Sequence, residues 1–154
     1  MKRMMMTVVA VVVCLTMSAE KNVVMPTMGC GEQAVVKMLG TPDEVNAGDE
    51  VVYHDLMFRG TRWDCIVVKY EQAGKLKMMK GLTLTESCRN AQEAFDLSAG
   101  LQQQLRRDYG WLDHNADDDS WMTYQGGEAK SNRYAFMLST KKEDKTNIVS
   151  LALY

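Results

Sequence analysis

Residues 29–42, with the sequence GCGEQAVVKMLGTP, constrain the fold more than any other part of the chain. Four apolar residues in this segment recur at i, i+1, i+4 and i+5, the spacing of one helical face: Ala34, Val35, Met38 and Leu39. Gly40 supplies a C-terminal stop, and Pro42 keeps the helix from resuming. We therefore expect a short amphipathic helix over residues 31–39, which must be held by packing because isolated short helices are marginal.

Three strand-like segments follow this helix. They are rich in β-branched and aromatic residues and cover residues 50–57, 62–70 and 75–84. Only short turns separate them, so they are predicted to be antiparallel neighbours. In the third segment the residues of one parity are apolar: Leu76, Met78, Leu82 and Leu84. One face of the sheet should therefore be apolar and the other solvated.

A second helix is predicted over residues 90–109. Asn90 followed by Glu93 resembles a capping box, and Gly110 is a natural stop. Three further strands are expected at residues 121–125, 133–140 and 147–154. The predicted fold class is α+β, an antiparallel β-sheet with two helices packed on one face, in the order α-β-β-β-α-β-β-β. Helices on one face would leave the other face free for recognition.

The N-terminal 19 residues are typical of a secretory signal peptide. Lys2 and Arg3 precede the apolar block 7–17, and the small residues Ser18 and Ala19 follow it. The block is shorter than the roughly 20 apolar residues that span a bilayer, so we expect no integral membrane span in the mature form. A buried N-terminal strand or a single-pass anchor is the alternative. The mature chain, residues 20–154, is predicted to be a single α+β domain, with helix plus meander at 28–84 and helix plus three strands at 90–154.

The expected location is the periplasm or the extracellular space. Cys14 raises lipid anchoring as an alternative, but three valines precede it, whereas lipoprotein signals carry a small residue there. Loss of residues 1–19 removes two of the 18 basic residues and none of the 20 acidic ones, which changes the formal charge from −2 to −4. An acidic chain lacks the basic surface that binds nucleic acid.

Three cysteines remain after removal of the signal: Cys30, Cys65 and Cys88. Cys30 precedes the first helix and Cys88 precedes the second, so a disulfide between them would tie two helix starts together. One bridge plus a free thiol fits an oxidising compartment. Three small packing residues without a bridge fit the same sequence.

Chemistry-bearing motifs are sparse. His54 lies beside Asp55 on a predicted strand, where neighbouring side chains point to opposite faces, so the pair is not a base with its orienting acid. An incomplete calcium loop places oxygen ligands at alternate positions: Asp113, Asn115, Asp117 and Asp119. Asp118 stands at the turn-glycine position, and Tyr124 stands where the loop needs glutamate. We expect a solvated acidic turn there, and no cofactor.

The helix and the first strands carry a family resemblance. Residues 29–42 close with Leu39, Gly40, Thr41 and Pro42, and Trp63 and residues 66–76 continue the pattern. Residues 28–80 thus resemble the SmpA/OmlA-like family of small outer-membrane lipoproteins. The β-lactamase-inhibitor-protein fold is built from two such units, and residues 90–154 are expected to stand in for the second. This resemblance implies the fold of these proteins and a function in binding another protein.

The leading hypothesis is an exported, non-catalytic module that binds another protein. Its candidate surface is the open sheet face around Tyr53, Trp63 and Tyr70, because tyrosine and tryptophan dominate interface hot spots. A narrower alternative is an inhibitor of a secreted or periplasmic enzyme. A third is a small secreted enzyme, which would need a histidine joined to an acid and to a nucleophile such as Cys65 or Cys88. The oligomeric state is left open by the sequence.

Overall fold

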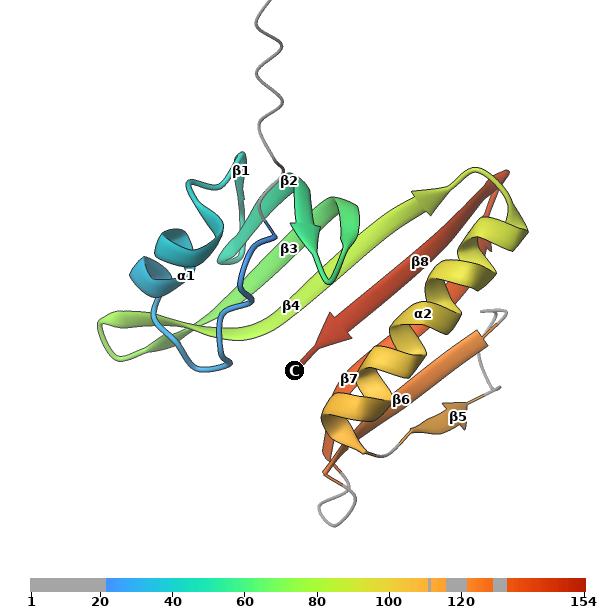
Figure 1. Ribbon diagram of the computed structural model, residues 1–154. Helices are drawn as coiled ribbons and strands as arrows, with labels where there is room; N and C mark the ends of the chain where they lie inside the picture. The colour runs from blue at the N-terminus through green and yellow to red at the C-terminus, as the bar shows by residue number, and fades with distance from the viewer. Residues whose placement is uncertain (1–21, 111, 116–121, 129–132) are drawn as a thin grey trace, which may run out of the picture.

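The computed structural model describes residues 22–110, 112–115, 122–128 and 133–154. An antiparallel sheet and two helices make up this part of the chain, which confirms the predicted α+β class (Figure 1). The helices are α1 (Glu32–Leu39) and α2 (Ala91–Tyr109). The strands are β1 (Glu44–Asn46), β2 (Glu50–Phe58), β3 (Thr61–Ala73), β4 (Leu76–Cys88), β5 (Asp113–Asn115), β6 (Met122–Glu128), β7 (Arg133–Glu143) and β8 (Thr146–Leu153). The predicted signal peptide, residues 1–19, lies outside the described residues.

The strands form one sheet in the order β1-β2-β3-β4-β8-β7-β6-β5, and each neighbouring pair is antiparallel. The predicted order α-β-β-β-α-β-β-β omitted β1 and β5 and is corrected by them. Each of these edge strands has three residues, too few to carry a recognisable alternation. Each half of the chain is therefore one helix followed by four strands, and the halves meet where β4 pairs with β8.

Both helices begin and end at the residues that local chemistry favours. The Asn90 side-chain oxygen accepts a hydrogen bond from the Glu93 N–H at 2.9 Å, which satisfies one of the free donors at the start of α2. Gly110 ends α2 with φ of 70°, a left-handed conformation that glycine adopts without strain. Gly40 ends α1, and its N–H donates to the Val36 carbonyl at 2.8 Å. These caps confirm the predicted helix boundaries to within one residue.

One face of the sheet carries the hydrophobic core, and we call it the first face. A row of side chains crosses five strands in register on this face, and each is at most 1% exposed: Tyr53, Ile66, Leu84, Leu151 and Leu138. The buried apolar residues of both helices belong to the same core cluster, with Val35 from α1 and Leu101 from α2. Helix α2 contacts β4, β6, β7 and β8, whereas α1 contacts β4.

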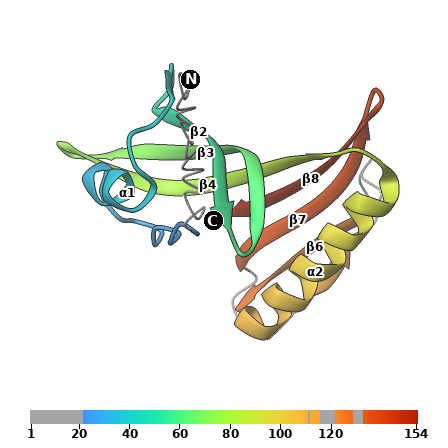
Figure 2. The same ribbon diagram turned by 45° about the horizontal axis from the view of Figure 1, so that its top comes forward.

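The β2–β3 hairpin curls between the two helices (Figures 1 and 2). Its β2 strand contains Asp55 with a left-handed φ of 55°, and the ladder is interrupted there. Beyond the interruption, Trp63 is fully buried and donates its indole N–H to the Phe58 carbonyl at 3.2 Å. At the tip, Arg59 forms an ion pair with Asp108 of α2. The hairpin therefore joins the N-terminal half of the fold to the end of the second helix.

Candidate functional site

The second face of the sheet is the one whose side chains alternate with the core rows. One of its rows runs across six strands in register: Val52, Val67, Thr83, Ala152, Met137 and Gln125. The adjacent row is His54, Cys65, Thr85, Ser150, Ser139 and Thr123. Most of these side chains are half-buried, so they are partly accessible to solvent. The centre of this face is thus made of hydroxyl, thiol and apolar groups.

Charged residues lie around this neutral centre. Lys69 and Glu50 form an ion pair across β3 and β2, with 3.0 Å between Nζ and Oε1. On the opposite side of the face, Lys141 of β7 is paired with Glu143. Specific protein interfaces have this organisation, with charge depleted at the core of the patch and concentrated at a polar rim.

The three aromatic residues predicted to form the binding surface lie elsewhere. Tyr53, Trp63 and Tyr70 are 1%, 0% and 3% exposed and all belong to the hydrophobic core. Their expected placement on the open sheet face is corrected by this burial. Burial raises the pKa of both tyrosines, and the neighbouring Glu32 carboxylate of α1 adds to the effect. The two phenol rings therefore lie near the start of α1.

His54 is the centre of a polar network at the edge of the second face. Its Nδ1 lies 3.0 Å from the Asp64 carbonyl oxygen, and its Nε2 lies 3.1 Å from Glu44 Oε1. Its backbone N–H donates to Asp43 Oδ2 at 2.7 Å. These contacts raise the pKa of His54, first through the hydrogen bond with Glu44 and then through the Asp64 carbonyl. The partner acids are thus Glu44 and Asp43 from the β1 segment, and not the adjacent Asp55.

Cys65 lies directly opposite His54 in the β2–β3 ladder. This is a cysteine–histidine pair of the kind that the alternative of a small secreted enzyme requires. Both ring nitrogens of His54 are already engaged by oxygen atoms. Burial raises the pKa of Cys65, and the carboxylates of Glu44 and Asp64 raise it further. An activated nucleophile needs a lowered thiol pKa and a free base, so the arrangement does not favour cysteine catalysis.

The possible disulfide between Cys30 and Cys88 is absent, and the cysteines of the described chain are free thiols. The Met79 N–H donates to the Cys30 carbonyl at 2.9 Å, which places Cys30 beside the middle of β4. Cys88 is the last residue of that strand. A strand rises about 3.3 Å per residue, so the stretch of β4 from Met79 to Cys88 separates the two cysteines by roughly 30 Å. A disulfide needs Cα atoms within about 7 Å of each other. The bridge, which was one of the two arrangements that the sequence left open, is therefore wrong.

The incomplete calcium loop lies only partly within the described chain. Asp113 and Asn115 begin and end β5, whereas Asp117 and Asp119 lie outside the described residues. Among the residues that the structure describes, no group of three or more His, Cys, Asp or Glu side chains could hold a metal ion.

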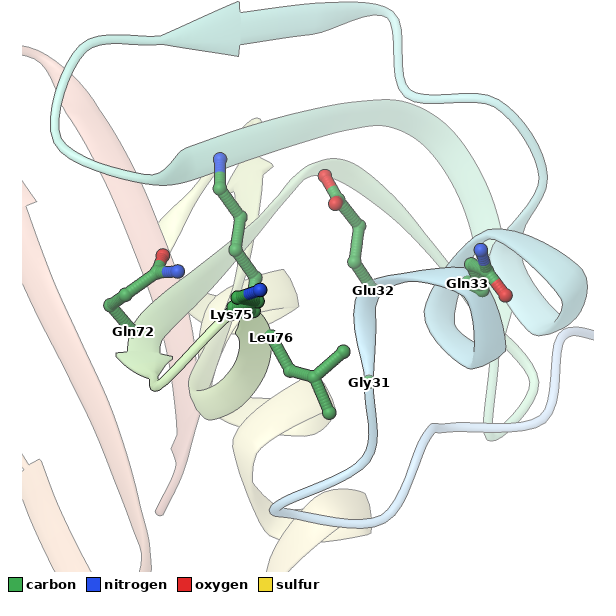
Figure 3. A pocket seen from close by; sticks show the side chains of 7 residues that line it. Gly31, Glu32, Gln33, Gln72, Lys75 and Leu76 are labelled. Carbon is green, nitrogen blue, oxygen red and sulfur yellow. The ribbon is translucent and has the colours of Figure 1, made fainter.

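A pocket of about 420 Å³ lies between the start of α1 and the β3–β4 turn. Figure 3 shows the pocket and labels all of its lining residues except Lys77: Gly31, Glu32, Gln33, Gln72, Lys75, Leu76 and Lys77. Lys77 is held by Asp49, with 2.8 Å between Nζ and Oδ1. Glu32 already supplies the negative charge that a helix N-terminus attracts, so an anion would meet a like charge there. We assign no ligand to this pocket.

Sequence reasoning expected an open sheet face but named the wrong residues for it, and it missed the His54 network. The network joins residues ten positions apart, which meet only once the β1–β2 and β2–β3 registers are known. A further network follows the same pattern: the Asp64 N–H donates to Glu86, and the Ser87 N–H donates to Asp64, at 3.0 and 2.9 Å. No short motif in the sequence signals such contacts.

Comparison with known proteins does not assign the chain to a family. No family model matches the chain, and neither the curated proteins nor the solved structures gave a match. The resemblance of residues 28–80 to the SmpA/OmlA-like family therefore stays a prediction. Within the described residues, neither helix is both long and apolar enough to cross a membrane.

Proposed function

We propose that this protein is an exported, non-catalytic module that binds another protein through the second face of its sheet. The observation that carries the proposal is the neutral, half-exposed centre of that face, which continues across both halves of the fold. The expected partner is a protein of the bacterial envelope or of the extracellular space. The signal-like N-terminal segment is the basis for the location.

The proposal requires both helices to lie on the first face. The mirrored strand order favours this arrangement, because the antiparallel pair β4–β8 relates the two halves by an approximate two-fold axis perpendicular to the sheet. A rotation about such an axis maps each face onto itself, so equivalent helices fall on the same face. The shared core cluster agrees, since Val35 of α1 and Leu101 of α2 both pack with first-face residues.

The chemistry of the second face favours a protein over a charged ligand. Thr83 and Thr85 of β4 lie opposite Ala152 and Ser150 of β8 at the centre. None of these four side chains carries a charge, so a partner can cover them without removing ions from water. Hydroxyl groups also offer donors and acceptors to a partner backbone. A surface of this kind suits a partner of mixed apolar and polar character.

The test uses paired lysine substitutions and crosslinking in an envelope fraction. Thr85→Lys puts a charge at the centre of the second face, where the native side chain is half-buried. Gln103→Lys puts the same charge on an exposed position of α2 and serves as the matched control. A partner captured by the native protein should be lost with Thr85→Lys and kept with Gln103→Lys. The partner is then purified and its affinity for all three forms is measured.

A partner that binds the Thr85→Lys protein as tightly as the native one contradicts the second face as the binding surface. Loss of binding with Gln103→Lys alone would move the surface to α2. Circular dichroism of both variants must match the native spectrum, because an unfolded variant would lose binding for another reason. Binding energy concentrates at the centre of an interface, so a charge at Thr85 should weaken affinity about tenfold or more.

Inhibition of a secreted or periplasmic enzyme is the narrower form of the same proposal. It is favoured by the two-unit strand order, which has the organisation expected for the tandem inhibitor fold. The discriminating assay is enzymatic, because an inhibitor reduces the turnover of its partner whereas an assembly module does not. The same Thr85→Lys variant should then fail to inhibit.

A further inference from the structure

The His54 ring bridges two strands by hydrogen bonds to two oxygen atoms. One is the backbone carbonyl oxygen of Asp64 on β3, 3.0 Å from Nδ1. The other is the carboxylate oxygen of Glu44 on β1, 3.1 Å from Nε2. Neither oxygen can donate a hydrogen bond when Glu44 is ionised, so both contacts require an N–H on the ring. Only the doubly protonated imidazolium has two such donors.

We propose that His54 is a proton-dependent clasp that holds the edge strand β1 in the sheet, closed when its ring carries both protons and loosened when it loses one. This proposal is independent of the proposed function. In the neutral ring, one nitrogen presents a lone pair to an oxygen about 3 Å away. That contact then becomes repulsive, whichever tautomer forms.

The strand that the clasp would hold has few other attachments. β1 pairs with β2 over three residues, and all three of its side chains are exposed. Next to β1, the Asp43 N–H donates to the Val52 carbonyl at 2.9 Å, and Asp43 Oδ2 accepts from the His54 N–H at 2.7 Å. The ring contact with Glu44 is thus a side-chain tie between β1 and the rest of the sheet. A short edge strand of this kind lies at the low-stability end of a fold.

The charged and titratable groups around the ring are mostly acidic. Asp43 and Glu44 face it from the β1 segment, whereas Asp64 and Cys65 come from β3. Glu44 and Asp43 both raise the pKa of His54. A histidine whose pKa is raised on folding stabilises the folded state. This stabilisation is fully present when the pH is below the unfolded-state pKa of 6.5, and it is lost as the pH rises through the pKa of the folded state. The clasp is therefore closed in mild acid and opens at higher pH.

Opening of the clasp has a structural consequence at the sheet edge. β1 covers the backbone of Glu50–Val52 at the outer edge of β2, through the pairs Glu44↔Val52, Val45↔Val51 and Asn46↔Glu50. Loss of this cover exposes unpaired N–H and C=O groups, which are a template for pairing with another strand. The protonation state of one histidine would thus set how often the edge of β2 is available.

Nuclear magnetic resonance of the ¹⁵N-labelled protein between pH 5 and 9 tests the clasp. The titration midpoint of the His54 ring should lie above 6.5. Protection of the Asp43 and His54 amides, corrected for intrinsic exchange, should fall through the same midpoint by about two- to fivefold, the range for exposed charge pairs. Glu44→Gln should lower the midpoint, and His54→Gln should remove the pH dependence of protection.

Lys77→Gln is the matched control, because it breaks another exposed ion pair, the one with Asp49, without touching the ring. Its pH profile should be that of the native protein. Amide protection that stays constant through the His54 titration would overturn the clasp. So would an equal fall in the His54→Gln protein, since the titrating group would then be another residue. Glu44→Gln retains the histidine and keeps the test decisive if His54→Gln perturbs the fold.

Discussion

Replacement of Tyr70 by phenylalanine, which removes the hydroxyl group of this core residue, should stabilise the protein. The Tyr70 side chain is 3% exposed, and its hydroxyl has no hydrogen-bond partner among the described residues. A buried polar group without a partner costs about 1–3 kcal/mol. Phenylalanine keeps the ring and its packing while removing that cost. The expected gain in the free energy of unfolding is about 1–2 kcal/mol.

Urea denaturation followed by tryptophan fluorescence measures this gain. For a domain of this size, each kcal/mol corresponds to roughly 3–5 °C in Tm, so thermal unfolding provides a second measurement. Tyr154→Phe is the matched control, because the Tyr154 side chain is 55% exposed and loses no buried group. That variant should change stability by less than about 0.5 kcal/mol.

The pH dependence gives an independent check on the same hydroxyl. Burial, followed by the nearby Tyr53 and Glu32, raises the pKa of Tyr70 above its ordinary value of 10. The unfolded chain therefore loses the tyrosine proton at a lower pH than the folded chain, and stability falls as the pH rises above about 10. Tyr70→Phe should reduce this alkaline loss. A variant that is less stable than the native protein by more than about 1 kcal/mol would refute the reasoning, because the hydroxyl would then be well bonded.

Three further predictions concern the core, a helix cap and a thiol. Leu84→Ala should lower the free energy of unfolding, measured by urea denaturation, by about 2–5 kcal/mol, because Leu84 is fully buried at the centre of the core row. A loss below about 1 kcal/mol would contradict that position. Asn90→Ala should cost about 1 kcal/mol by removing the cap on the Glu93 N–H, whereas Asn90→Asp should keep most of it. Burial raises the pKa of Cys88 to about 11, so at pH 8 Cys88 should react with a thiol reagent more slowly than Cys65. Equal reaction rates would contradict the burial of the Cys88 thiol.

The sequence predicted the parts of this fold that depend on local chemistry. Both helices carry their signals within a few residues: glycine after each last turn, and Asn90 before the second. The long strands were recognised because their composition favours extended backbone. Pairing between neighbouring strands followed from the short turns. These features require no knowledge of distant contacts.

Strand parity failed where the ladder is irregular. The register shifts between Lys69 and Tyr70, so the parity that holds for Leu82 and Leu84 does not apply to the first residues of β4. Met79 is consequently buried, whereas Leu76 is 65% exposed. A bulge of this kind inserts one residue and moves the following side chains to the other face. Alternation alone cannot locate it.

The candidate site was harder to predict than the fold because its residues are chemically ordinary. Tyrosine and tryptophan drew attention as interface anchors, yet the same apolar area makes them good core residues, and Trp63 illustrates this by its complete burial. The centre of the second face consists mainly of threonine, serine, cysteine and apolar side chains, which are common in any sequence. Only the register shows that Thr85, Ser150 and Ser139 lie side by side.

The mirrored sheet also explains why the two halves must act together. If the first half stood alone, β4 would be a 13-residue edge strand, paired with β3 on one side and with the backbone groups of its other side unpaired. Long exposed edges of this kind promote aggregation, whereas pairing with β8 covers residues 82–88. The same pairing brings Thr83 and Thr85 next to Ala152 and Ser150, so the centre of the second face exists only at the junction. We therefore infer that stability and the proposed binding surface both depend on the β4–β8 pair, and that neither half retains the function by itself.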